Sequence, residues 1–267
     1  MAELLLRGEG LGDVQAVLFD KDGTLSISEP QLLTLAKARV FLCLERVEPD
    51  LRPELHRLLL RVYGLRPLPG RASDVPAAIC PAGITAVASR DHNLIATATA
   101  LVQVGLGWPE AFALSEQVFV EADEADARRV TAGQSRATSA TTEGLQVLLE
   151  QLHAAGVRSG VISNDDTAGI EHFLVSHGLV TYFQGYWSAE HRPRKPDPAA
   201  VHGLCAVLGV APEHCALIGD ANSDLRMAVD AGIPHRRAIG YVAAWSLPPP
   251  LAASHPRLRH WSELALA

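Results

Sequence analysis

Two acidic residues, Asp20 and Asp22, follow an apolar run and are the residues of this chain best placed to do chemistry. The run covers Val14–Phe19, and Gly23 just beyond it permits an unusual turn. Carboxylates two residues apart can then face one cavity, where they repel each other unless a cation or a shared proton offsets their charge. A solvated turn produces the same Asp-x-Asp pattern. The pair therefore indicates either a catalytic or metal-binding site or an ordinary turn, and other segments have to decide.

Two further apolar runs also end at polar residues. Arg158–Ile162 is followed by Ser163 and Asn164, and Ala216–Ile218 is followed, after one glycine, by Asp220. Short, nearly continuous apolar runs are typical of strands buried on both faces of a parallel sheet. Ligands bind to such sheets outside the carboxyl ends of the strands. We therefore expect these polar side chains and the first acidic pair to gather at one edge of a sheet.

Helical patterns separate the expected strands. Gly144–Ala155 carries four leucines on one stripe, Ala199–Leu208 follows two prolines, and Ser223–Ala231 begins with a capping serine. His235–Gly240 is a weaker candidate for a fourth strand. This alternation of strands and helices predicts an α/β fold built on a doubly wound parallel sheet.

The chain between residues 29 and 140 breaks this rhythm. It is rich in Leu, Ala and Arg, with helical periodicity over Leu32–Leu44, Glu54–Tyr63, His92–Val104 and Glu110–Arg129. We therefore predict a helical domain, residues 29–140, inserted into an α/β core that consists of residues 1–28 and 141–267.

Composition excludes several classes of function. The 267 residues carry a formal net charge of −7, whereas a protein that binds nucleic acid needs a basic face. No apolar run reaches the roughly 18 residues of a membrane helix, and the first residues do not form a signal peptide. The four cysteines fit no zinc spacing and are expected to be reduced. We expect a cytoplasmic protein without a nucleic-acid or membrane partner.

Four segments together resemble a known family. Asp20–Thr24 (Asp-Lys-Asp-Gly-Thr) resembles the first motif of the haloacid dehalogenase (HAD) superfamily in its phosphatase form, and Ser163-Asn164 resembles the second. Lys195–Pro198 and Gly219–Asp224 resemble the third and fourth. The four occur in order with typical spacing, and the helical insert resembles the C1-type cap of the family. The resemblance implies a Rossmann-like HAD core with a cap domain, in the phosphoglycolate-phosphatase-like branch.

The resemblance implies a role for each catalytic residue. Asp20 would be the nucleophile that forms an aspartyl-phosphate, and Lys195 would help to keep it ionised. Asp22 would protonate the leaving alcohol and then take a proton from the hydrolytic water. Ser163 and Asn164, together with Lys195, would bind the oxygens of the transferring phosphate.

The same resemblance implies a Mg²⁺ cofactor. Its ligands would be the side chains of Asp20 and Asp220, the backbone carbonyl of Asp22, and Asp224 either directly or through water. Mg²⁺ prefers hard oxygen ligands of this kind and retains part of its water shell.

The remaining polar residues near these motifs have structural explanations. On an extended strand end Lys21 would alternate away from its two acidic neighbours, so we expect it to be structural. Asp165 and Asp166 could add to the acidic field near the metal, but we expect them to cap the helix that starts near Thr167.

One polar cluster lies in the helical insert. Arg90 and His92, within Ser89–Asn93, could contact the leaving group of the substrate, and the start of a helix explains them equally well.

Together these features predict Mg²⁺-dependent hydrolysis of a small phosphorylated metabolite, a phosphomonoester. A sugar phosphomutase of the β-phosphoglucomutase type shares all four motifs and the cap, and is the main alternative. A non-enzymatic phospho-acceptor of the receiver-domain type is less well matched, because it has no inserted cap. Asp22 also argues against it, since an acid two residues after the nucleophile serves turnover rather than a lasting phosphoryl mark.

Overall fold

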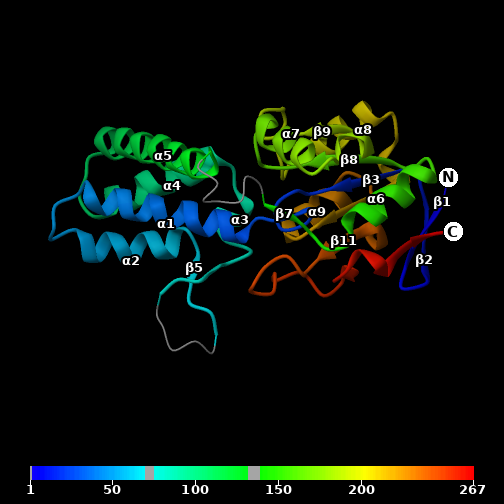
Figure 1. Cartoon of the computed structure of the whole chain (residues 1–267), viewed down its shortest axis with the longest axis horizontal. Helices are drawn as coiled ribbons and strands as arrows, with labels where there is room; N and C mark the ends of the chain where they lie inside the picture. The colour runs from blue at the N-terminus through cyan, green and yellow to red at the C-terminus, as the bar shows by residue number, and fades with distance from the viewer. Residues whose placement is uncertain (1, 70–74, 132–138) are drawn as a thin grey trace. The chain divides into compact units, whose positions relative to one another are not determined.

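The computed structural model describes residues 2–69, 75–131 and 139–267 (Figure 1). The chain divides into two compact units. Met1–Ile27 and Ala140–Ala267 form the first, here called the core unit, and Ser28–Ser139 form the second, the helical unit. The helical unit is thus one continuous segment that interrupts the chain of the core unit. In the part of the chain that is described, no helix is both long and apolar enough to cross a membrane.

A parallel sheet of six strands forms the centre of the core unit, in the order β12-β11-β10-β3-β8-β9. Its strands are β3 Ala16–Phe19, β8 Arg158–Ile162, β9 Phe183–Trp187, β10 Cys215–Gly219, β11 Ala238–Tyr241 and β12 Arg257–Leu258. The predicted α/β fold with a parallel sheet is confirmed. The central strand β10 is buried at all five positions, which explains its unbroken apolar sequence.

Helices cover both faces of this sheet. They are α6 Leu145–Ala154, α7 Thr167–Ser176, α8 Pro198–Leu208 and α9 Asn222–Asp230. The leucine stripe of α6 packs in one apolar cluster with residues of α7, whereas α8 and α9 contribute to a second cluster. Two separate apolar layers on one sheet are what a doubly wound fold requires. Short 3-10 turns complete the unit: η1 Val180–Tyr182, η2 Pro212–His214, η3 His235–Arg237 and η4 Trp261–Glu263.

Two of the expected strand boundaries are wrong. Val14 ends a different strand, so β3 begins only at Ala16. The expected strand His235–Gly240 begins at Ala238, because its first three residues form the turn η3.

A second sheet joins the two ends of the chain, and the sequence did not indicate it. Its strands are β1 Ala2–Leu6, β2 Glu9–Val14 and β13 Leu264–Leu266, in the antiparallel order β13-β1-β2. Leu4 pairs with Leu266, and Figure 1 shows the two termini at the same end of the core unit. A small pair, β4 Ser26–Ile27 with β7 Ala140–Thr141, joins the segments on either side of the insert.

The helical unit consists mainly of five helices in its described residues: α1 Glu29–Glu45, α2 Arg52–Val62, α3 Ile84–Val87, α4 Arg90–Gln103 and α5 Trp108–Thr131. A short hairpin pairs β5 Leu65–Arg66 with β6 Ala78–Ile79. The interior of the helical unit holds the buried rings of Tyr63 and Phe119. It also holds a buried arginine, Arg39, whose guanidinium lies 3.8 Å from the centre of the Phe119 ring. The four predicted helical segments all overlap helices of this unit.

Candidate active site

Three predicted site residues lie directly beyond neighbouring strands of the core sheet. Asp20 follows β3, Ser163 follows β8 and Asp220 follows β10. Because β10, β3 and β8 are adjacent and parallel, their carboxyl ends meet at one edge. The expectation that these residues gather there is therefore confirmed by the topology of the sheet.

A buried lysine joins the first and fourth motifs. Lys195 Nζ lies 2.7 Å from Oδ1 of Asp20 and 2.8 Å from Oδ1 of Asp224, and it donates to the carbonyl of Ile162 at 3.3 Å. Burial alone would lower the pKa of Lys195, but the two carboxylates outweigh it and raise that pKa above its ordinary value. The lysine is therefore a fixed positive charge.

Three buried carboxylates face this lysine. Oxygen atoms of Asp20, Asp220 and Asp224 all lie within 4.8 Å of one another. Burial, opposed by Lys195, raises the pKa of Asp20 to about 7, and burial together with the neighbouring carboxylates raises that of Asp220 well above its ordinary value. Protein groups alone thus do not stabilise the fully ionised cluster.

The donor set fits a hard divalent cation. Three carboxylates and one ammonium leave two negative charges in a buried space, and all the candidate ligand atoms are oxygens. The side chain of Asp22 is not in this group. The metal role inferred for Asp22 involves its backbone carbonyl and stays a prediction.

Lys21 does not point away from Asp22, and that part of its prediction is wrong. Its Nζ lies 2.8 Å from Oδ1 of Asp22 and 3.0 Å from Oδ2 of Asp165. The chain has already left the strand here, because the Lys21 carbonyl accepts from the backbone N–H groups of Thr24 and Ser26 in a tight turn. The alternation expected of an extended strand therefore does not apply.

The two acidic residues after Ser163 have different roles. Asp166 caps α7 as expected, since its side chain accepts from the N–H of Gly169 at 2.7 Å. Asp165 pairs instead with Lys21. Ser163 is buried, and its Oγ accepts from the N–H of Asp165 at 3.1 Å.

Trp245 is a site residue that the sequence did not indicate. Its indole Nε1 donates to Oδ2 of Asp220 at 2.5 Å, and the residue is only 7% exposed. Gly23, with a positive φ of 82°, lies against both groups, so a Cβ atom there would collide with the indole and with the Asp220 carboxylate. No spacing rule links Trp245, in the loop after β11, to the fourth motif.

The polar cluster of the helical unit has local partners. Ser89 caps α4 by accepting from the backbone N–H of His92, and Arg90 Nε lies 2.8 Å from Oδ2 of Asp123. The guanidinium of Arg90 also lies over the Phe119 ring, 5.3 Å from its centre. These contacts match a helix start, and a substrate role for Arg90 and His92 stays a prediction.

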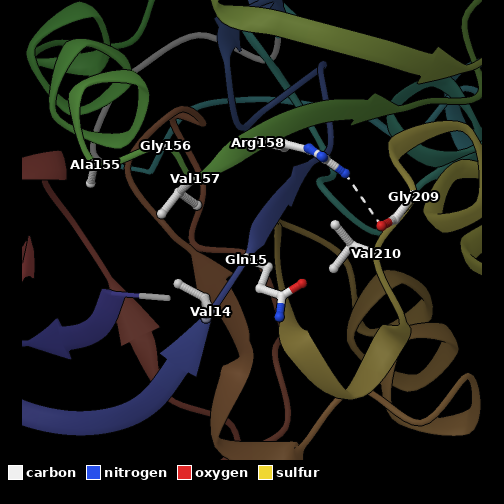
Figure 2. Close-up of a pocket in the computed structure, with 8 residues that line it drawn as sticks. All are labelled: Val14, Gln15, Ala155, Gly156, Val157, Arg158, Gly209 and Val210. Carbon is white, nitrogen blue, oxygen red and sulfur yellow. Dashed lines mark hydrogen bonds between the residues drawn. The ribbon is translucent and has the colours of Figure 1, made fainter.

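A cavity of about 280 Å³ lies at the opposite, amino-terminal edge of the core sheet. Its lining residues are Val14, Gln15, Ala155, Gly156, Val157, Arg158, Gly209 and Val210. Figure 2 shows Arg158 reaching across it to the carbonyl of Gly209. None of the predicted site residues is among the eight, so this cavity is separate from the acidic cluster.

Comparison with known proteins identifies the family to which this chain belongs. Residues 14–232 match the model of the haloacid dehalogenase-like hydrolase family. The chain belongs to this family. All four motif segments of the HAD core lie within the matched residues.

Curated relatives match part of this chain. Phosphoglycolate phosphatase of Thiobacillus denitrificans is 37% identical over 101 residues, which cover 38% of this chain and 43% of the relative. That of Yersinia pseudotuberculosis is 30% identical over 123 residues, 45% of this chain and 52% of the relative. The chain thus spans about half the length of the curated relatives it matches.

Two solved structures align over nearly the whole chain. One, a predicted phosphoglycolate phosphatase from Haemophilus somnus, has a TM-score of 0.62 at 20% identity and covers 95% of this chain and 97% of its own. Another, provisionally named β-phosphoglucomutase, from Thermotoga maritima, has a TM-score of 0.55 at 18% identity and covers 94% and 96%. At these identities the likeness establishes the fold.

Proposed function

We propose that this HAD protein is a Mg²⁺-dependent phosphatase of small phosphomonoesters. The observation that carries the proposal is the buried cluster of Asp20, Asp220 and Asp224 beside Lys195. It combines a candidate nucleophile, a fixed positive charge and a set of hard oxygen ligands in one place. The names of the curated relatives support the same activity.

Asp20 is the proposed nucleophile. One of its carboxylate oxygens attacks the phosphorus atom, and an aspartyl-phosphate bond forms while the bond from phosphorus to the ester oxygen breaks. Lys195, 2.7 Å away, favours the ionised carboxylate that this attack requires. Ser163 and Asn164, just beyond β8, are proposed to bind the non-bridging oxygens of the phosphoryl group together with Lys195.

Asp22 is the proposed general acid and base. Its carboxylic acid gives a proton to the departing ester oxygen, which leaves as an alcohol. The resulting carboxylate then takes a proton from a water molecule as that water attacks the phosphorus of the aspartyl-phosphate. Inorganic phosphate leaves, and Asp20 and the protonated Asp22 are restored.

The metal is proposed to be held by the side chains of Asp20, Asp220 and Asp224, with the backbone carbonyl of Asp22. When bound, Mg²⁺ offsets the negative charge of the phosphoryl group and of its ligands. Trp245 holds one oxygen of Asp220 in place through its indole N–H, so that this carboxylate is oriented before the ion arrives.

The helical unit is proposed to act as a cap that selects the leaving group and excludes bulk water. Such a cap favours small metabolites over phosphoproteins, nucleic acids or membrane surfaces. Because curated relatives are phosphoglycolate phosphatases, 2-phosphoglycolate is the first ester to test.

Release of phosphate from a panel of small esters, with Mg²⁺ and with a chelator, tests the proposal. We expect Mg²⁺-dependent release that Asp20→Asn abolishes. Isomerisation of sugar phosphates with a bisphosphate primer, without net release, would favour the phosphomutase. A stable single phosphorylation without release would favour the phospho-acceptor.

A further inference from the structure

A second ion-pair network lies next to the acidic cluster, and it centres on the buried side chain of Lys21. Its ammonium contacts Oδ1 of Asp22 at 2.8 Å and Oδ2 of Asp165 at 3.0 Å. The residue is 7% exposed, and its Nζ lies 5.7 Å from the centre of the Phe173 ring, on α7. A lysine enclosed in this way has less conformational freedom than a lysine on a solvated surface.

Asp165 holds the lysine in place because it is itself anchored. Its Oδ1 accepts from the N–H of Asp166 at 2.9 Å, and its own N–H donates to Oγ of Ser163 at 3.1 Å. The position of Lys21 is therefore fixed by the loop that follows β8, although Lys21 belongs to the loop that follows β3.

The two oxygens of Asp22 have different surroundings. Oδ1 receives both Lys21 Nζ and the hydroxyl of Ser26, the latter at 3.2 Å. Both of these donors contact Oδ1, and neither contacts Oδ2. Two donors thus hold one oxygen of Asp22, and they fix the orientation of its carboxyl group.

We propose that Lys21 is a positioning residue: with Asp165 behind it and Ser26 beside it, it holds Asp22 by Oδ1 so that Oδ2 exchanges the proton with the leaving group. This inference rests on the proposed phosphatase activity, in which Asp22 is the general acid. Proton transfer requires the acid to lie within hydrogen-bond reach of the oxygen it protonates. A carboxylate free to rotate on a turn would spend only part of its time in that geometry.

A purely structural role for Lys21 predicts a different result. If the lysine only balanced charge in the loops, its loss would lower activity on all esters to the same extent. If it positions the acid, its loss matters in proportion to how much the leaving group needs a proton. An alkoxide leaving group needs protonation, whereas p-nitrophenolate leaves readily without it.

Lys21→Met, which keeps the length of the side chain and removes its charge, tests the inference. The kcat of the variant and the wild type is compared on an alkyl ester, 2-phosphoglycolate or the best alkyl ester of the panel, and on p-nitrophenyl phosphate. We expect a loss of about tenfold or more on the alkyl ester, within the range that general acid catalysis supplies, and a much smaller loss on the aryl ester. Asp166→Ala, which removes the neighbouring helix cap but no contact to Lys21, is the matched control and should change both esters equally.

A double-mutant cycle makes the test sharper. If Lys21 acts through Asp22, adding Lys21→Met to Asp22→Asn should cost no further activity on the alkyl ester. Asp165→Asn, which weakens the anchor of the lysine, should show the same dependence on the leaving group with a smaller loss, and it replaces Lys21→Met if that variant does not fold.

Three results contradict the inference. Equal losses on both esters, or a further loss in the Asp22→Asn background, would overturn it while leaving the phosphatase activity of the wild type intact. Failure of the wild-type protein to hydrolyse either ester with Mg²⁺ would instead overturn the proposed function, and the inference with it.

Discussion

The ammonium of Lys195 lies 2.7 Å from Oδ1 of Asp20, although 175 residues separate them in the sequence. Both groups are buried, and the pair is completed by Asp224 at 2.8 Å from the same ammonium. A charge pair this enclosed is costly to break, because either partner alone would be left unpaired away from water. The buried ion pair therefore helps the sheet to hold the first motif, which contains Asp20, next to the third, which contains Lys195.

Asp20→Asn should reduce phosphatase activity below detection. The amide is a poor nucleophile, so the covalent step on residue 20 is lost. Phosphate release from the best ester, at saturating Mg²⁺, measures this. Asp230→Asn, an exposed carboxylate at the end of α9, serves as the control and should keep full activity. Unchanged turnover in Asp20→Asn would remove the proposed nucleophile.

Asp22→Asn should lower kcat on alkyl esters by about 10²–10⁴-fold, the usual contribution of general acid–base catalysis. Binding of Mg²⁺ should change little, because the side chain of Asp22 lies outside the carboxylate cluster. Isothermal titration of Mg²⁺ into the variant measures the second expectation. Turnover equal to that of the wild type would mean that another group protonates the leaving alcohol.

The positions where β3, β8 and β10 end were predictable, because each strand is a short apolar run that polar residues follow. The residues beyond β3, β8 and β10 follow directly from parallel pairing, which needs only local sequence and one topological rule. The direction of Lys21 could not be predicted, because it depends on the turn closed by the N–H groups of Thr24 and Ser26. The alternation of side chains along a strand was extended beyond the end of β3, and it therefore predicted the wrong direction for the Lys21 side chain.

Pairings between distant segments were also beyond the sequence. The contact of Trp245 with Asp220 joins two loops and leaves no periodic signal in either. The pairing of Leu4 with Leu266 joins the two ends of the chain, and β1 and β13 are too short to be distinguished from loops by alternation alone. Local patterns thus indicated the candidate site residues, whereas the contacts between distant segments could be seen only in the structure.

Stabilisation of the protein by Mg²⁺ should increase with pH. Burial raises the pKa of Asp20 to about 7 and that of Asp220 well above its ordinary value in the metal-free protein. An acid with a higher pKa in the folded than in the unfolded state favours folding when protonated, so the metal-free fold loses stability as pH rises from about 4 through about 7. Mg²⁺ binds the ionised carboxylates and removes this loss.

The shift in Tm caused by Mg²⁺, measured by thermal unfolding at about pH 5.5 and about pH 8, checks this expectation. It should be larger at the higher pH. Asp220→Asn, which removes one proposed ligand, should show little shift at either pH. A shift in the wild type that is the same at both values would contradict the assignment of a cation to this cluster.

Trp245→Phe should weaken Mg²⁺ binding by about tenfold, the usual effect of removing a group that orients a metal ligand. The phenyl ring keeps most of the apolar contact but cannot donate to Oδ2 of Asp220. Isothermal titration of Mg²⁺ gives the affinity directly, and Trp108→Phe, at an exposed position in the helical unit, is the matched control. An unchanged affinity would show that the indole hydrogen bond does not orient the ligand.

Trp261→Ala should lower the free energy of unfolding of the core unit by about 3–5 kcal/mol, the usual cost of removing a large buried aromatic side chain. The indole is 1% exposed, stacks on Tyr241 with ring centres 4.7 Å apart, and donates to Oγ1 of Thr142 at 2.8 Å. It also meets the ring of Phe19, the residue before the proposed nucleophile, at 5.9 Å.

Urea unfolding of the variant and of the wild type measures the loss. Trp108→Ala, where the ring is 50% exposed, should change the free energy by no more than about 0.5 kcal/mol and separates burial from the general effect of losing an indole. A loss below about 1 kcal/mol for Trp261→Ala, the size of a single hydrogen bond, would mean that the tail does not pack into the core. The larger loss would show that the segment after β12 stabilises β3, the strand that ends just before Asp20.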